Sequence, residues 1–140
     1  MKLLSLLVLN KPESGDPTAL KAAFDLTSFG YFQRGSIKEF IRFTSKILAQ
    51  RTPLASPPLS VKEKEYMCHC YVRTDGLVGV CVSDEEYQPR VAHSLIAKIL
   101  DDFAAQVPRA EWTTGKEVAG FSGPLDVYLK KYQGCHSLLP

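Results

Sequence analysis

The residues with the greatest chemical potential are four cysteines and three histidines, and the tightest group is Cys68-His69-Cys70. Structural zinc sites usually place two to four residues between paired cysteines, whereas one residue separates these two. On a strand, Cys68 and Cys70 would share one face and His69 would point to the other, so a single metal ion would not reach all three. We therefore expect the thiols to be small buried hydrophobes, and we predict no metal and no cofactor.

Sequence motifs for catalysis are missing from the chain. The segment GFSG at 120–123 is one residue short of a nucleophile elbow and has no strand before it, so Ser122 is predicted to cap the last helix instead. There is no phosphate loop, dinucleotide fingerprint or H-E-x-x-H pair. The three histidines, His69, His93 and His136, have no carboxylate or nucleophile near them in sequence. These observations predict that the chain is not an enzyme.

The alternative to a non-catalytic protein is an enzyme that uses a cysteine thiol. Its nucleophile would be Cys68, Cys70 or Cys81. Such a site needs a thiol whose pKa lies far below the free value of about 8.5.

The first ten residues, MKLLSLLVLN, could be a signal peptide or a strand. The apolar run from Leu3 to Leu9 is followed by a turn, NKPESGDP, and not by a cleavage site of small residues. The run is also far shorter than the roughly 20 residues that span a bilayer. It predicts a central strand, a cytoplasmic protein and reduced cysteines.

Length and charge narrow the remaining classes. A chain of 140 residues suits one domain with one core. The net charge of +2 is too small to argue by itself for nucleic acid or a membrane, and we predict no nucleic-acid partner.

Hydrophobic periodicity predicts five strands and three helices. The strands are expected at 2–9 and 19–26, near 59–64, and as the two arms of a hairpin over 65–84 whose turn is TDG. The helices are expected at 36–50, 87–106 and 122–132. The order ββ-α-βββ-α-α, with the first and fifth strands most apolar, predicts a three-layer α/β domain with a mostly antiparallel sheet at its centre.

Several finer details follow from the same patterns. Leu20, Ala22, Phe24 and Leu26 are expected on one face of the second strand. Ser36 and Glu39 are expected to form a capping box. The buried stripes of the helices are predicted as Ile37, Phe40, Ile41, Thr44, Ile47 and Leu48; Val91, Leu95, Ile96, Ile99, Leu100 and Phe103; and Leu125, Tyr128, Leu129 and Tyr132.

The first helix also carries an aromatic residue away from its predicted stripe. At roughly 100° per residue, Phe43 lies about 105° from the stripe centre, on a rim beside Phe40 and Ile47. Just upstream, Phe29, Tyr31 and Phe32 crowd the turn before the helix. These aromatics either close the start of the helix onto the core or form an exposed patch that binds a partner.

Four segments together resemble a known family. They are DLTSFGYFQRGSIKEFIRFTSKI, YMCHCYVRTDGLVGVCVSDEEYQPRVAHSLIAKILDDF, VPRAEW and LDVYLKKYQ. In this order they resemble the longin domain of the prenylated longin R-SNARE, which has a lipid anchor and no transmembrane helix. The resemblance implies a profilin-like longin fold, with a five-stranded antiparallel sheet, one helix on one face and two on the other.

The same resemblance implies a function. The longin domain of this family is non-catalytic, folds back on the SNARE core and takes part in vesicle transport and membrane fusion, including traffic between the endoplasmic reticulum and the Golgi. Phe43 corresponds to an aromatic that contacts the SNARE core, with Phe40 and Ile47 beside it. The implied partners are an amphipathic SNARE-core helix, other SNAREs and trafficking factors. Peripheral association with Golgi and vesicle membranes is expected only through a lipidated full-length form of the family.

The end of the chain departs from the family. We expect a longin domain over 1–133 and a short tail over 134–140 without SNARE heptads. Five residues follow Cys135, so it does not fit a prenylation box. The runner-up interpretation is a stand-alone longin-fold subunit, such as an adaptor small chain or a tethering-complex component, which would need a second large apolar face.

Overall fold

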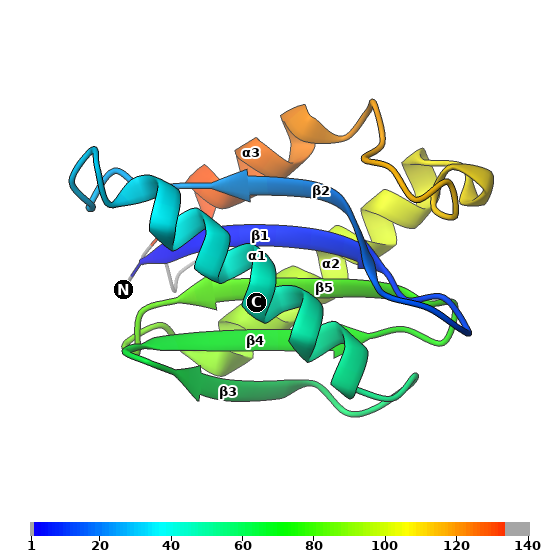
Figure 1. Cartoon of the computed structure of the whole chain (residues 1–140), viewed down its shortest axis with the longest axis horizontal. Helices are drawn as coiled ribbons and strands as arrows, with labels where there is room; N and C mark the ends of the chain where they lie inside the picture. The colour runs from blue at the N-terminus through cyan, green and yellow to red at the C-terminus, as the bar shows by residue number, and fades with distance from the viewer. Residues whose placement is uncertain (1, 134–140) are drawn as a thin grey trace.

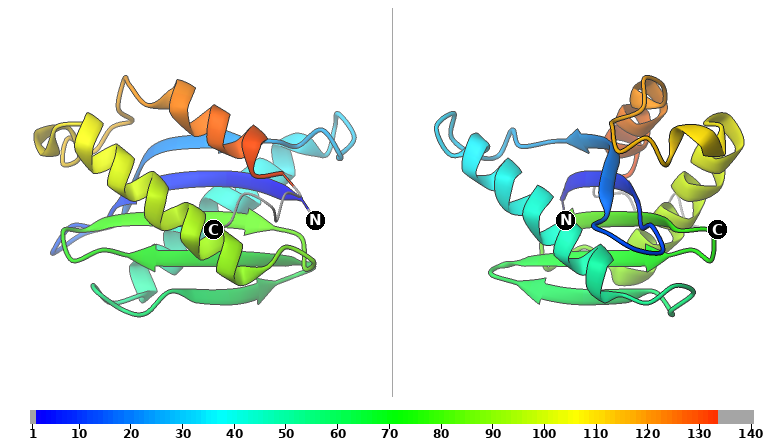
Figure 2. Two further views of the ribbon diagram at one scale, coloured as in Figure 1. Left: turned by 180° about the vertical axis from the view of Figure 1, so that it is seen from behind. Right: turned by 45° about the vertical axis from the view of Figure 1, so that its right-hand side comes forward.

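A computed structural model describes residues 2–133 and shows a five-stranded antiparallel sheet between two helical layers. The sheet order is β2-β1-β5-β4-β3. The strands are β1 (Leu3–Asn10), β2 (Thr18–Phe24), β3 (Leu59–Glu63), β4 (Tyr66–Val72) and β5 (Leu77–Ser83). Helix α1 (Arg34–Arg51) crosses one face, while α2 (Pro89–Gln106) and α3 (Ser122–Lys131) cover the other (Figures 1 and 2). A short 3-10 turn, Arg109–Glu111, follows α2. The predicted fold class is confirmed.

The central strands are β1 and β5, as predicted. Every residue of both strands is buried, because helices cover both faces of the sheet here. The apolar start of the chain is therefore a core strand. At the edge of the sheet, β3 is partly exposed and carries Lys62 and Glu63, which suits an edge that must not pair with another chain.

The turn between β4 and β5 confirms the predicted hairpin. Gly76 has a φ of +93°, a conformation that residues with a side chain rarely adopt. A Cβ atom on Gly76 would also lie 2.8 Å from the carbonyl oxygen of Lys11. Both facts require glycine at this position. The turn of the hairpin therefore packs closely against the end of β1.

The sheet separates two apolar clusters. Beneath α2 and α3, the predicted stripe of α2 is buried at all six positions. Leu125 and Leu129 of α3 and Tyr132, which follows the helix, are buried beside it, while Tyr128 is partly buried. Beneath α1, the cluster includes Leu4, Leu7, Cys68 and Cys70.

The prediction that Leu20, Ala22, Phe24 and Leu26 share a face is wrong for Leu20. The register between β1 and β2 shifts at this point, where Val8 pairs with Lys21 and Leu9 pairs with Ala19. Leu20 is the extra residue of a β-bulge, and it lies in the cluster beneath α2 and α3. The other three lie in the cluster beneath α1.

Both predicted helix caps are also wrong. Helix α1 starts at Arg34 with Gln33 as its N-cap and no side-chain cap bond, so Ser36 and Glu39 fall inside its first two turns. Helix α3 starts at Ser122 itself, after Phe121 in a left-handed conformation. In both cases the chain enters the helix before the polar residue that could have capped it.

The buried stripe of α1 is rotated from its predicted position. Its fully buried residues are Ile41, Ser45 and Ala49. The remaining predicted members are half-buried and flank this line: Ile37, Phe40, Thr44, Ile47 and Leu48. The rotation turns the opposite side of the helix, which includes Phe43, fully outward.

Candidate functional site

The outer surface of α1 carries the predicted aromatic site. Phe43 is 68% exposed, although it lies in the middle of an 18-residue helix. Phe40 and Ile47, one turn to either side, are half-buried. The three residues thus form an apolar ridge along α1, with the exposed ring of Phe43 at its centre and the half-buried Phe40 and Ile47 on either side.

The inner half of this surface is an aromatic cluster. The rings of Phe29 and Phe40 both lie against Tyr66 of β4, with centroid distances of 6.2 and 6.0 Å. The ammonium of Lys64 lies 4.7 Å from the centroid of the Phe40 ring. Phe29 is half-buried and is held as a plug at the start of the helix, which was one of the two sequence interpretations.

Tyr31 and Phe32 are exposed, which the interpretation as a binding patch requires. They are 78% and 94% exposed, and their rings meet edge to face at 5.4 Å. They lie in the loop between β2 and α1, which projects beyond the end of the sheet (Figures 1 and 2). The structure therefore places Phe29 and Phe40 in an inner cluster, Phe43 and the half-buried Ile47 on α1, and Tyr31 and Phe32 as an exposed pair in the loop.

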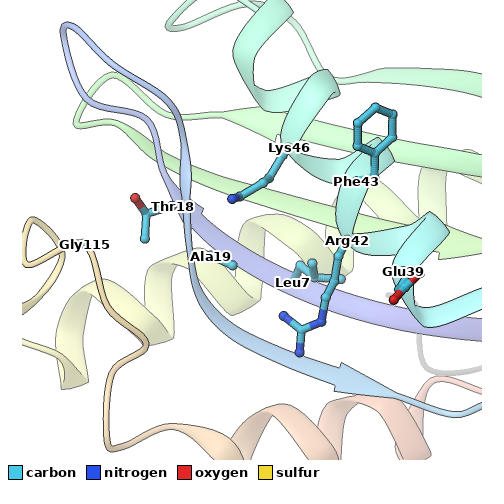
Figure 3. Close-up of a pocket in the computed structure, with 8 residues that line it drawn as sticks. All are labelled: Leu7, Thr18, Ala19, Glu39, Arg42, Phe43, Lys46 and Gly115. Carbon is cyan, nitrogen blue, oxygen red and sulfur yellow. The ribbon is translucent and has the colours of Figure 1, made fainter. Parts of the chain in front are cut away.

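A groove runs on the other side of α1, between the helix and β2 (Figure 3). It has a volume of about 460 Å³, and Leu7, Thr18 and Ala19 form its strand side. Arg42 and Lys46 extend from the helix toward β2, and Glu39 and Phe43 also line the groove on its helix side. The exposed ring of Phe43 and the cations Arg42 and Lys46 therefore border the same groove.

The environment of the three described thiols disfavours a reactive thiolate. Cys68, Cys70 and Cys81 are buried and free. Burial raises the pKa of Cys68 to about 11 and that of Cys70 to about 12, and it raises the pKa of Cys81 as well. A nucleophilic thiol needs the opposite shift, so the environment of these thiols argues against the thiol-enzyme alternative.

Sequence reasoning missed a chain of hydrogen bonds beneath α2. The hydroxyl of Ser60 on β3 lies 2.7 Å from Nδ1 of His69 on β4 and 2.9 Å from Nε2 of His93 on α2. Nε2 of His69 lies 3.0 Å from the hydroxyl of Ser83 on β5. We call these four residues the histidine–serine chain.

The proton positions in the histidine–serine chain follow from the hydrogen bond that Ser83 donates. The Ser83 hydroxyl donates to the carbonyl of Asp84, so it accepts from Nε2–H of His69. His69 Nδ1 must then accept from Ser60, and Ser60 in turn accepts from His93. His69, which donates from Nε2 and accepts at Nδ1, is therefore neutral, whereas His93 donates from Nε2 in either of its charge states. Burial lowers the pKa of His69 to about 4, with His93 as a smaller cause, and burial lowers the pKa of His93.

In the histidine–serine chain, no carboxylate among the described residues accepts a hydrogen bond from either histidine, and no nucleophile is activated. Its geometry therefore suits a structural role. Within residues 2–133, no group of three or more histidine, cysteine or acidic side chains is placed to hold a metal ion. Cys135 and His136 lie outside the described residues.

The basic residues of α1 were also missed from the sequence. Arg34, Lys38, Arg42 and Lys46 recur every four residues and are all exposed. The four-residue spacing is visible in the sequence, but the net charge of the whole chain is small and gives no sign that basic residues gather on one helix.

The sheet order, with one helix on one face and two on the other, defines a small three-layer α/β domain. A family profile described as Longin, regulated-SNARE-like domain, matches residues 26–122. The chain belongs to this longin family, and its relatives place it with the longin R-SNAREs.

Curated relatives extend the similarity over nearly the whole chain. The "Synaptobrevin homolog ykt6" of Schizosaccharomyces pombe is 43% identical over 136 residues, which cover 95% of this chain and 66% of the relative. The "VAMP-like protein YKT61" of Arabidopsis thaliana is 41% identical over 95% of this chain and 66% of its own length. The "Synaptobrevin homolog YKT6" of Yarrowia lipolytica is 37% identical over 97% of this chain and 68% of its own length. The chain thus spans about two thirds of these relatives. Among residues 2–133, no helix is long and apolar enough to cross a membrane.

Proposed function

We propose that this chain acts as the regulatory longin domain of a vesicle-trafficking R-SNARE, on the cytoplasmic side of Golgi and vesicle membranes. In this proposal the outer surface of α1 binds an amphipathic helix, the SNARE core, and thereby holds it out of fusion complexes. The domain itself performs no chemistry. Its relatives carry the names of synaptobrevin homologues, which supports the trafficking role.

The observation that carries the binding proposal is the exposure of Phe43. A phenylalanine that is 68% exposed in the middle of a helix contributes little to folding, and the half-buried Phe40 and Ile47 extend the apolar surface beside it. A SNARE core presents apolar side chains at heptad spacing. A helix laid along such a ridge can bury Phe43 as an anchor.

The runner-up, a stand-alone trafficking subunit, would need a second large apolar face. Away from α1 and the loop before it, the large exposed apolar side chains among residues 2–133 are Leu54 and Val127. They belong to different parts of the chain, one after α1 and one on α3. This distribution favours the regulatory domain.

The test is a titration of a labelled peptide that carries the SNARE heptads of a relative. We expect the wild-type chain to bind it, and Phe43→Glu to weaken binding by about 2 kcal/mol or more, as for an anchor residue. Val127→Glu is the matched control, because Val127 is 61% exposed but lies on α3, beyond the sheet. Equal affinity of wild type and Phe43→Glu would reject the proposed site.

A further inference from the structure

The positive charge of the chain is concentrated on α1. This helix has five basic residues and one acidic residue, Glu39. Because the whole chain has 17 basic and 15 acidic residues, twelve basic and fourteen acidic residues remain elsewhere. The helix thus carries a formal charge of +4 on a body with a charge of −2, an asymmetry typical of a surface that meets an anionic partner.

Four of the cations form one row along the helix. Arg34, Lys38, Arg42 and Lys46 are four residues apart, so they follow one another on neighbouring turns. The charged groups of Lys38 and Arg42 lie 4.9 and 5.3 Å from the centroid of the Phe24 ring. The ring supports both side chains while the residues remain exposed to solvent.

The exposed aromatic pair lies at the start of this row. Tyr31 and Phe32 lie in the projecting loop (Figure 2), and only Gln33 separates them from Arg34. The loop is held by its own hydrogen bonds, because the Gln33 amide donates to the Gly30 carbonyl at 2.9 Å and the Gly30 amide donates to the Gln33 side chain at 3.0 Å. The two rings are therefore presented on a hydrogen-bonded turn and not on an irregular segment without internal hydrogen bonds.

We propose that this surface, namely Tyr31, Phe32 and the four cations of α1, binds the surface of an anionic lipid bilayer without a covalent lipid. Phe32 and Tyr31 enter the interfacial layer, where aromatic rings are favoured. The cations contact headgroup phosphates, as basic side chains do on peripheral proteins. This proposal goes beyond the proposed function and does not rest on it, since it involves neither Phe43 nor a SNARE helix.

An acidic protein partner could also pair with the cations, but the aromatic pair favours the membrane. The rings lie at the end of the projecting loop. Such a loop suits insertion into the interfacial layer of a bilayer better than insertion into a rigid protein pocket. Each surface cation near an anionic leaflet strengthens binding about fivefold, so a row of four is enough for measurable binding when two rings also insert.

The experiment is co-sedimentation of the full chain with vesicles of phosphatidylcholine alone or mixed with phosphatidylserine, at two salt concentrations. We expect binding to the mixed vesicles only, and weaker binding at higher salt because of screening. Lys46→Ala should weaken binding about fivefold. Phe32→Ser should weaken it by about tenfold.

Matched controls separate this surface from general effects. Lys98→Ala removes an exposed cation from α2, on the opposite face of the sheet, and Leu54→Ser removes an exposed apolar side chain outside the patch. Both should bind like the wild type. Absence of binding, equal binding to both vesicle types, or equal losses in the controls would overturn the proposal. So would binding of polyglutamate through these residues without binding of vesicles, which would indicate an acidic protein partner instead.

Discussion

The hydroxyl of Ser60 joins His69 and His93, which are 24 residues apart in the chain, by hydrogen bonds of 2.7 and 2.9 Å. This contact ties the edge strand β3 to the outer helix α2 through two imidazoles, and His69 must stay neutral to accept the hydrogen bond from Ser60. The edge of the sheet is therefore attached to the helical layer by bonds that depend on pH.

We expect the free energy of unfolding to fall between pH 7 and pH 5. The folded-state pKa of His69 is about 4, against 6.5 in the unfolded chain, so the unfolded chain binds the proton first. The stabilisation is complete above pH 6.5 and is lost as the pH falls toward 4, and the loss due to His69 at pH 5 is about 2 kcal/mol. The lowered pKa of His93 adds in the same direction.

Urea unfolding at pH 7.5, 6.0 and 5.0 measures this dependence. His69→Gln removes the titrating imidazole, so its stability should change much less over the same range, whatever its stability at pH 7.5. A wild-type stability that does not change between pH 7.5 and 5.0 would show that His69 is not held neutral.

A second prediction concerns the buried thiols. In a Cys135→Ser background, Cys68, Cys70 and Cys81 should react with a disulfide reagent at pH 7.5 only after denaturant is added. Their burial and raised pKa values leave almost no thiolate in the folded chain. Fast reaction of one thiol in the native protein, measured by absorbance, would reopen the thiol-enzyme alternative.

A third prediction compares two glycines. A Cβ at Gly79 would lie 2.5 Å from Cγ2 of Ile96, where β5 meets α2. Gly79→Ala should therefore destabilise the domain by about 1–3 kcal/mol through overpacking. Gly35→Ala, in α1, meets nothing within 4 Å and should stabilise by up to about 1 kcal/mol because alanine favours the helix. Thermal melts of both variants test the pair, and equal shifts would contradict the packing of α2 on β5.

A fourth prediction separates the two phenylalanines of α1. Phe43→Ala should change the free energy of unfolding by less than about 0.5 kcal/mol, because the ring is exposed. Phe40→Ala should cost about 1–2 kcal/mol, less than the 3–5 of a fully buried ring, because Phe40 is half-buried against Tyr66. Denaturant titration decides the matter, and a large loss for Phe43→Ala would show that its ring is part of the core.

Much of the fold could be predicted from the sequence because its signals are local. The stripe of α2 repeats with the helical period and is buried at every predicted position, and the glycine of the β4–β5 turn is required by its own backbone conformation. The apolar runs of β1 and β5 likewise predicted their central places, since a strand covered on both faces must be apolar on both.

Only the tertiary structure decided which way several side chains point. The bulge at Leu20 depends on the pairing of β2 with β1, and a one-residue shift moves a side chain to the other face. The rotation of α1 depends on how Ile41, Ser45 and Ala49 fit the sheet, and it decides that Phe43 faces solvent. The histidine–serine chain unites residues from three strands and a helix, so no local pattern could contain it. Periodicity in the sequence determines that an element has a buried face, whereas packing against the rest of the chain determines which residues lie on it.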